Sequence, residues 1–157
     1  MALKYKSTAV FLKPDVRYKS KLLSKFINGV MKGGKKATAE KCVYQAFDLI
    51  KERVQEEEPL KVFETAIDNV RPMVEVRSKR VGGATYQVPM PVEKARQTAL
   101  AFRWVLAAVR KKKGRPLAQK LAGELLDAYN RQGEAMTTRE NVHRMADANK
   151  AFAHFAW

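Results

Sequence analysis

The 157-residue sequence contains a single cysteine, Cys42, and only two histidines, His143 and His154. One cysteine excludes an internal disulfide framework and a zinc finger built on cysteine pairs, and it fits a reducing, intracellular setting. Neither a Ser-His-Asp arrangement, nor a pair of catalytic carboxylates, nor a glycine-rich cofactor loop can be recognised from residue spacing. We therefore predict a protein that is not an enzyme and that binds no metal, cofactor or small-molecule substrate.

Long apolar runs are missing as well. The most apolar stretch, Thr98 to Val109, is interrupted by Arg103 and is shorter than the about 20 residues of a membrane-spanning helix. The first ten residues contain two lysines and no sustained apolar region, so no secretory signal is expected. These features predict a cytoplasmic protein without a membrane partner. The chain is still 46% hydrophobic, which is enough for one buried core.

Acidic residues are scarce: 16 Asp and Glu stand against 31 Lys and Arg, for a net charge of +15. The excess is confined to two segments. Residues 1–36 contain ten basic residues and one acidic residue, and residues 77–120 contain twelve and one, whereas residues 37–76 and 121–157 are slightly acidic. Because such an excess repels itself in a compact fold, a polyanion is the expected partner. Two concentrated basic segments favour nucleic acid with a dedicated binding face.

Apolar residues recur at helical spacing in six segments, and one segment between the third and fourth alternates with a period of two. We predict a mainly α fold: a six-helix domain with one protruding β-hairpin between the third and fourth helices. Residues 1–18 lack periodicity and are expected to form an extended basic arm, and residues 19–157 a single domain. The last helix is expected to begin at Thr137, because Thr137 and Glu140 have the spacing of a capping box. The expected helices are 20–31, 37–54, 59–70, 92–110, 116–129 and 137–152, with the hairpin at about 73–91.

The predicted hairpin is the most informative element. Its two strands meet at Gly82 and Gly83, and three cations, Arg77, Lys79 and Arg80, precede this turn. No other segment reads as a strand, and an isolated two-stranded ribbon is only marginally stable in water. One interpretation is a ribbon lying flat on the helices with solvated charges. The favoured interpretation is a protruding basic finger that docks into nucleic acid, with glycines allowing close backbone approach.

Two further basic clusters lie in or next to helices. Arg96, Arg103 and Arg110 are seven residues apart, so they drift by only about 20° per step and share one side of a helix. The stripe continues into Lys111 to Lys113 and Arg115 and is expected to bind phosphates; the alternative is an exposed face with snorkelling stems. The turn from Lys32 to Lys36 is expected to touch RNA phosphates or else to be solvated. It resembles a phosphate loop, but position 36 is lysine and a helix precedes it, so nucleotide hydrolysis is excluded.

Three stretches resemble the bacterial-type small-subunit ribosomal protein seven family. Gly34-Lys35-Lys36 with Val43 and Ala46 resembles the family signature. The stretch from Asn69 to Pro89 resembles the family hairpin, and the stretch from His143 to His154 resembles its C-terminal tail. The resemblance covers nearly the whole chain, from about Pro14 onward. Without it, the residues indicate only a helical nucleic-acid binder, and they do not distinguish RNA from DNA.

The resemblance implies a structural constituent of the small ribosomal subunit that binds the 3′ major domain of the rRNA and nucleates assembly of the head. It also implies that the hairpin reaches the exit-site tRNA and the mRNA path, beside ribosomal proteins of the head and platform. A helical DNA-binding protein is the competing hypothesis, although scattered basic patches and a hairpin suit irregular RNA better. The residues expected to contact rRNA are Lys4, Lys6, Lys13, Lys32, Lys35, Lys36, Arg71, Arg77, Lys79, Arg96, Arg103, Arg110, Lys111, Lys112, Lys113, Arg115, Arg144 and Lys150. The residues expected on the tRNA and mRNA side of the hairpin are Arg77, Lys79, Arg80, Val81, Gly82, Gly83 and Ala84.

Overall fold

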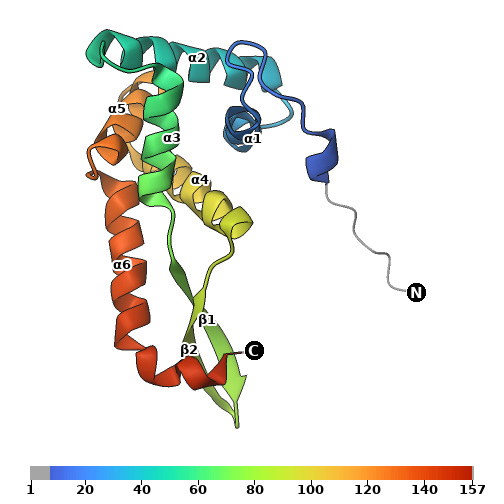
Figure 1. Cartoon of the computed structure of the whole chain (residues 1–157), viewed down its shortest axis with the longest axis vertical. Coiled ribbons are helices and arrows are strands. Elements are labelled where there is room, and N and C mark those ends of the chain that lie inside the picture. The colour runs from blue at the N-terminus through green and yellow to red at the C-terminus, as the bar shows by residue number, and fades with distance from the viewer. Residues whose placement is uncertain (1–7, 157) are drawn as a thin grey trace.

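The structure is a computed structural model that describes residues 8–156. Five helices form a head at one end of the molecule, and the hairpin and the last α-helix extend from this head side by side (Figure 1). The mainly α fold with a hairpin between the third and fourth α-helices is confirmed. The helices are α1 (Lys21–Val30), α2 (Lys36–Arg53), α3 (Pro59–Val70), α4 (Lys94–Lys111), α5 (Leu117–Tyr129) and α6 (Glu134–Ala148), the strands are β1 (Val74–Val81) and β2 (Ala84–Pro91), and two short 3-10 segments are η1 (Thr8–Phe11) and η2 (Lys150–Phe155).

Local sequence explains most of the helix boundaries. The Ser20 hydroxyl accepts a hydrogen bond from the Leu23 N–H and caps α1. Gly33 and Gly34 adopt positive φ angles of 58° and 73°, and this turn separates α1 from α2. Pro59 opens α3 at a position where the missing N–H costs nothing. These elements were all predicted to within two residues.

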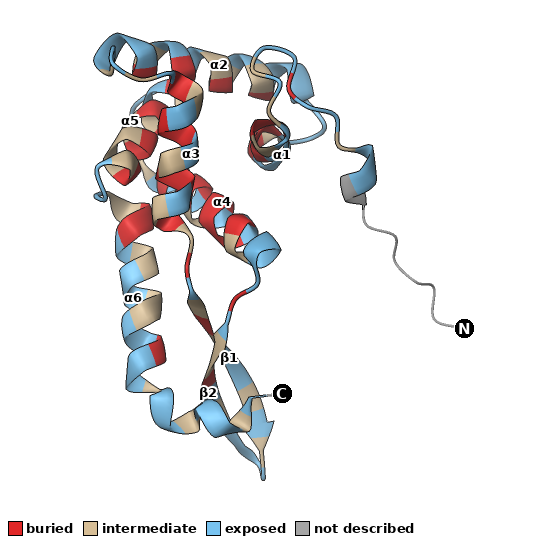
Figure 2. Cartoon of the chain, in the orientation of Figure 1, coloured by how far each residue is buried: buried red, intermediate tan, exposed pale blue. Residues whose placement is uncertain are grey.

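The core lies within the head, where buried residues of α1 to α5 face one another (Figure 2). Its centre is a group of four phenylalanines, one each from α1, α2, α3 and α4. Phe26 packs 5.1 Å from both Phe63 and Phe102, measured between ring centroids, and Phe47 lies 5.7 Å from Phe63. Tilted and edge-on ring pairs of this kind stabilise a core beyond the burial of their area. Helix α5 closes the head against α2, α3 and α4.

The start of α6 was predicted wrongly. The helix begins at Glu134 after Gly133, whose φ is 92°, and the Thr137 hydroxyl donates to the Gly133 carbonyl inside the first turn. The helix N-terminus is instead satisfied by α5: the fully buried Glu124 accepts a hydrogen bond from the Ala135 N–H at 2.9 Å. Because this acceptor comes from another helix, no local capping pattern marks the true start. The helix also ends at Ala148, and the chain continues as η2 rather than as one helix to residue 152.

Asp15 ties the chain before α1 to the head. Its side chain accepts hydrogen bonds from the N–H groups of Arg17 and Tyr18 and from the Tyr44 hydroxyl of α2, the last at 2.6 Å. Arg17 also forms an ion pair with Asp48 of α2 at 2.7 Å. Residues 15–18 are therefore docked on α2, and the boundary of the extended arm at residue 18 stays a prediction. The arm residues Lys4 and Lys6 lie outside the described residues.

We expect the contact between Tyr44 and Asp15 to make stability fall at high pH. Burial, and next the hydrogen bond to Asp15, raise the pKa of Tyr44 to about 12, whereas an unfolded tyrosine titrates near 10. The stabilisation is therefore complete below about pH 10 and is lost as the pH rises through 12. Urea unfolding at pH 8 and pH 11 measures this loss. Tyr44→Phe should show a smaller loss than the unaltered chain, and Tyr86→Phe, a change on the hairpin, should leave it unchanged. Equal losses in all three proteins would contradict the prediction.

Candidate nucleic-acid interface

Cations from the end of α1, the turn after it, α4 and the loop after α4 gather on one side of the head. Lys32 and Lys35 flank the two glycines of the α1–α2 turn, and both side chains are exposed. Neither forms an ion pair with a carboxylate among residues 8–156. Lys36 is exposed at the first position of α2. These three predicted rRNA contacts are therefore available to a polyanion.

The α4 stripe is present as predicted, because Arg96, Arg103 and Arg110 are all exposed. Two of its members share a surface. Arg103 and Arg110 line a hollow of about 420 Å³ between α1 and α4, together with Lys25 and the backbone of Gly29. The Arg110 guanidinium donates a hydrogen bond to the Gly29 carbonyl at 3.3 Å, which places its charge between the two helices. None of the described side chains that line this hollow is acidic.

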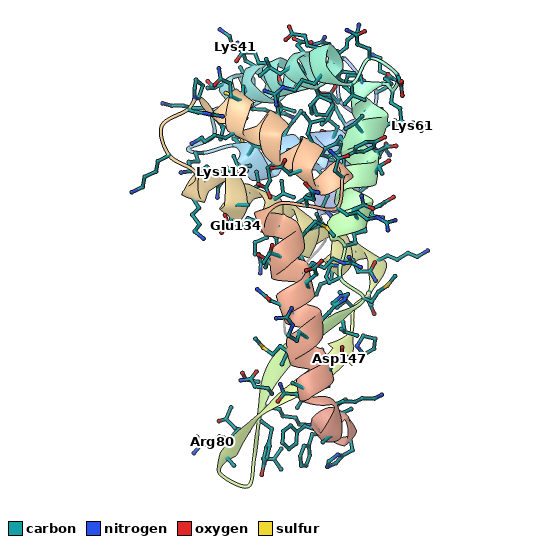
Figure 3. All side chains as sticks on the ribbon, turned by 90° about the vertical axis from the view of Figure 1, so that its left-hand side faces the viewer. Lys41, Lys61, Arg80, Lys112, Glu134 and Asp147 are labelled. Carbon is teal, nitrogen blue, oxygen red and sulfur yellow. The ribbon has the colours of Figure 1, made fainter. Side chains whose placement is uncertain are left out.

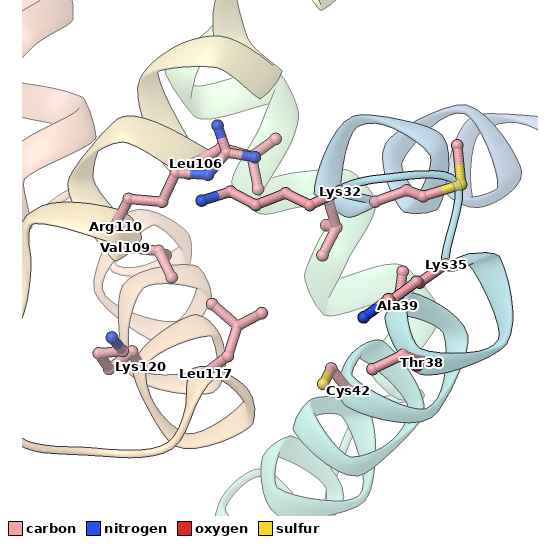
Figure 4. A pocket seen from close by; sticks show the side chains of 12 residues that line it. Lys32, Lys35, Thr38, Ala39, Cys42, Leu106, Val109, Arg110, Leu117 and Lys120 are labelled. Carbon is pink, nitrogen blue, oxygen red and sulfur yellow. The ribbon is translucent and has the colours of Figure 1, made fainter.

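A second hollow of about 380 Å³ adjoins the first, since Arg110 and Leu106 line both. Here the cations are Lys32, Lys35 and Arg110, with Lys120 from α5 on the opposite wall (Figure 4). Lys25 and Lys120 were not predicted as site residues. In the sequence, α1 and α5 are marked by apolar residues that face the core, and nothing distinguishes Lys25 or Lys120 as a binding residue. The packing of α1 and α5 beside α4 brings these lysines next to the arginines. The two hollows form one cationic surface.

The lysine run after α4 divides into two kinds of residue. Lys113 and Arg115 are exposed, as the predicted phosphate contacts require. Lys112 instead turns inward, with its Nζ 2.6 Å from Glu124 and 3.7 Å from Asp127. Burial on its own lowers the pKa of Lys112, but the two carboxylates outweigh it and the pKa is raised. Lys111 pairs with Glu134 at the start of α6. Figure 3 labels Lys112, just after α4, and Glu134, at the start of α6.

At the root of the hairpin, one buried carboxylate holds two of the predicted RNA-binding arginines. Glu75 of β1 lies 2.6 Å from the Arg77 guanidinium and 2.9 Å from that of Arg96 on α4. Both arginines remain partly exposed around this carboxylate, so the trio keeps a net positive charge at the surface. Glu75 thus joins the hairpin to the α4 stripe. This link could not be predicted from residue spacing, because Glu75 and Arg96 are 21 positions apart.

The hairpin packs against α6 and η2. The Tyr86 ring of β2 packs 5.2 Å from Phe152 and 5.0 Å from Phe155, measured between ring centroids. The Lys79 ammonium donates a hydrogen bond to the Phe155 carbonyl at 2.7 Å. Lys79 is thus engaged by the C-terminal segment. An isolated ribbon is marginally stable, and this apolar contact on one face supplies the missing support.

At the other end of β1, the His143 ring of α6 accepts a hydrogen bond from the Met73 N–H at 3.2 Å, just before the strand begins. Accepting this bond requires a neutral imidazole. Burial, and next the charge of Arg139, lower the pKa of His143. The neutral form is therefore favoured at neutral pH, and α6 holds the hairpin at its root while η2 holds it at its middle.

The tip of the hairpin extends past η2 (Figure 1). Gly82 and Gly83 form a two-residue turn with φ angles of 57° and 86°, which non-glycine residues adopt only with strain. Arg80 and Ala84 are exposed beside this turn, and Val81 is half-buried. Arg80 is the cation nearest the tip. The hairpin therefore combines both sequence interpretations: its middle packs against helices, and its tip protrudes.

The remaining predicted contacts lie apart from the two hollows. Lys13 is exposed before the Asp15 turn, and Arg144 and Lys150 are exposed on α6 and η2. Arg71 is half-buried after α3 and forms an ion pair with Asp68 at 2.5 Å. The structure thus brings together the α1–α2 turn and the α4 stripe, and it leaves these four cations on separate parts of the surface.

The part of the chain that the structure describes contains no cluster of His, Cys, Asp or Glu suited to a metal ion. Within the same part, no helix is long and apolar enough to span a membrane. The described surface is instead marked by cations without nearby carboxylates, next to a basic-tipped hairpin. Fold and surface together define a helical protein built to bind a polyanion.

Comparison with known proteins identifies the family. The model of the family "Ribosomal protein S7p/S5e" matches residues 3–150. A protein of Rhodopirellula baltica named small ribosomal subunit protein uS7 is 62% identical over 144 residues, which cover 91% of this chain and 92% of that protein. Proteins of the same name from Thermosipho africanus and Desulfotalea psychrophila are 56% and 52% identical, with 92% of each chain covered. The chain belongs to the ribosomal protein S7p/S5e family, which confirms the expected family and a structural rather than an enzymatic role.

Proposed function

We propose that this protein is an rRNA-binding structural constituent of the small ribosomal subunit and works in the cytoplasm, where ribosomes translate. The observation that carries the proposal is the acid-free cationic surface formed by α1, the α1–α2 turn and α4. Lys32, Arg103 and Arg110 are exposed on it without a carboxylate partner among the described residues. A folded RNA supplies closely spaced phosphates to such a surface, and membership of a ribosomal protein family supports rRNA as that RNA.

Competition binding tests this proposal. The protein is titrated with a folded fragment of the 3′ major domain of small-subunit rRNA, in the presence of excess duplex DNA and at several salt concentrations. We expect binding that survives the DNA competitor. If at least about six phosphates are contacted, affinity should fall about a thousandfold between 50 and 200 mM salt. Equal affinity for both nucleic acids would favour the DNA-binding alternative.

The finer proposal concerns assembly and the translating ribosome. We propose that binding to the 3′ major domain nucleates assembly of the head, and that the hairpin tip reaches the exit-site tRNA and the mRNA path beside neighbouring head and platform proteins. Two observations support this division of roles. The cationic surface lies on the head of the protein, whereas Arg80 and the glycine turn lie at the far end of the hairpin (Figure 3). The support from Tyr86 and η2 holds that tip at a fixed distance from the rRNA-facing surface.

We expect Arg80→Ala to leave rRNA binding within twofold of the unaltered chain and to speed release of exit-site tRNA about tenfold. An exposed arginine that donates to a phosphate contributes on the order of 1.5 kcal/mol, which corresponds to about tenfold. Reconstituted small subunits carrying each variant provide the measurement. Thr85→Ala is the matched control, because Thr85 pairs with Arg80 across the strands, is also exposed and is uncharged. Unchanged tRNA release in Arg80→Ala subunits would refute the role of the tip.

A further inference from the structure

The lining of the hollow of about 380 Å³ is unsuited to a phosphate group alone. Its inner wall is apolar, made by the buried side chains of Val30, Leu106 and Val109 and the half-buried Leu117. A solvated phosphate gains nothing from an apolar wall, whereas a flat aromatic group gains burial there. The volume lies at the lower end of the range of about 300–1,000 Å³ for small-molecule pockets, so it suits one small ring system.

The rim of the same hollow is cationic. Lys32 and Lys35 reach over it from the α1–α2 turn, and Arg110 stands at its border with the neighbouring hollow (Figure 4). Lys120 lines the α5 wall, where its ammonium donates to the Lys112 carbonyl at 2.9 Å. No described acidic side chain lines the hollow. A group that is apolar and flat in its centre and anionic at its edges complements this arrangement, and a nucleotide is such a group.

We infer that this hollow receives one unpaired base of the bound RNA, a guanine or a uracil, with the flanking phosphates on Lys32, Lys35 and Arg110. The inference rests on the proposed rRNA binding and specifies how one part of the surface recognises RNA. Proteins that read folded RNA take hold of unstacked bases of loops and bulges rather than bases inside a helix. An apolar wall buries the face of such a base, and the cationic rim beside it binds the flanking phosphates.

The preference for guanine or uracil follows from the hydrogen-bonding groups of the lining side chains. The lysines and Arg110 only donate, and the Thr38 hydroxyl is the one conventional acceptor among the described side chains of the hollow. Guanine and uracil present carbonyl oxygens, which accept from lysine and arginine. Adenine and cytosine present exocyclic amino groups at the corresponding positions, and these groups need acceptors that the lining provides only at Thr38. Carbonyl-bearing bases are therefore favoured.

The single cysteine reports on occupancy of the hollow. Cys42 of α2 is half-buried and lines it, so a base in the hollow must shield the thiol. We expect the rate of Cys42 alkylation by N-ethylmaleimide to fall at least tenfold when the folded rRNA fragment is bound. Short single-stranded oligomers of uridine or guanosine should protect the thiol at lower concentration than those of adenosine or cytidine. Protection by all four homopolymers alike would overturn the base preference.

A filled hollow provides the second test. Thr38→Phe places a ring in the hollow from an exposed position in the first turn of α2, and Ala37→Phe adds the same ring at a neighbouring exposed position that does not line it. We expect Thr38→Phe to weaken binding of the rRNA fragment about tenfold, the effect of no longer burying one base against the apolar wall, with an unchanged salt dependence. Ala37→Phe should change affinity less than twofold.

The outcomes separate this inference from the proposed function. If the unaltered chain binds the rRNA fragment specifically but Cys42 stays as reactive as in the free protein, and Thr38→Phe binds normally, the base-binding hollow is refuted and the rRNA-binding role stands. If the unaltered chain fails to prefer the rRNA fragment over duplex DNA, the proposed function itself fails.

Discussion

Replacing Arg103 and Arg110 together with alanine should weaken binding of the folded rRNA fragment about a hundredfold. Both guanidinium groups are exposed on the hollow between α1 and α4, and no described carboxylate lines that hollow. Each is expected to donate to a phosphate, a charge-assisted contact worth on the order of 1.5 kcal/mol, or about tenfold in affinity. The slope of log affinity against log salt should fall by about two, because two fewer counterions are released. Filter binding or fluorescence anisotropy over a salt series measures both quantities.

A control variant should remove two positive charges from a part of the surface away from α4. Lys51 and Lys61 are exposed on α2 and α3, within the segment whose net charge is acidic. Lys51→Ala with Lys61→Ala should weaken rRNA binding less than threefold, the effect of a distant, screened charge. Thermal unfolding of both double variants should nearly match the unaltered chain. Among the described residues, the stripe variant loses the exposed hydrogen bond from Arg110 to Gly29, and the control loses the exposed ion pair between Lys61 and Glu57. Equal losses of affinity in the two double variants would mean that only the net charge matters.

The helical head was predictable because local signals and apolar periodicity agree there. Ser20, the glycines of the α1–α2 turn and Pro59 mark boundaries that the structure confirms. Where the structure differs, the deciding contact comes from a distant residue. The start of α6 is fixed by Glu124, eleven positions before its hydrogen-bond partner. The hairpin is supported by aromatic residues of η2, which follows the last α-helix and is more than 60 positions from Tyr86.

The basic surface was predictable in part for the same reason. Helical spacing was enough to place Arg96, Arg103 and Arg110 on one side of α4. Spacing within one helix says nothing about neighbours on other elements, so it missed that Glu75 holds Arg96, and it missed Lys25 and Lys120 beside the stripe. Charge counting also treats every lysine of a run alike, whereas burial separates Lys112 from its neighbours.

Glu124→Ala should destabilise the protein by about 3 kcal/mol. Glu124 is fully buried, and it satisfies two groups at once: the Ala135 N–H at the start of α6 and the Lys112 ammonium. Its removal leaves the buried Ala135 N–H without an acceptor and leaves the Lys112 ammonium with only the more distant Asp127 carboxylate as a counter-charge. For a chain of this length, this loss corresponds to a drop of about 6–12 °C in the unfolding temperature. Differential scanning calorimetry and urea unfolding measure it directly.

Variants of Glu124, Lys112 and Lys113 show which of these lysines stabilise the fold and which bind RNA. Glu124→Gln keeps an oxygen for the Ala135 N–H but loses the charge, so it should cost less than Glu124→Ala. Lys112→Met should also destabilise the protein. Combining it with Glu124→Gln should lower the free energy of unfolding by less than the sum of the two single changes, because each change removes the partner of the other.

Lys113→Ala, next to Lys112 but exposed, should leave stability unchanged and weaken rRNA binding. If Lys112→Met instead weakened rRNA binding and left stability intact, its contact with Glu124 would give way to RNA in the complex. In that case all three lysines of the run would belong to the interface, as charge alone had suggested.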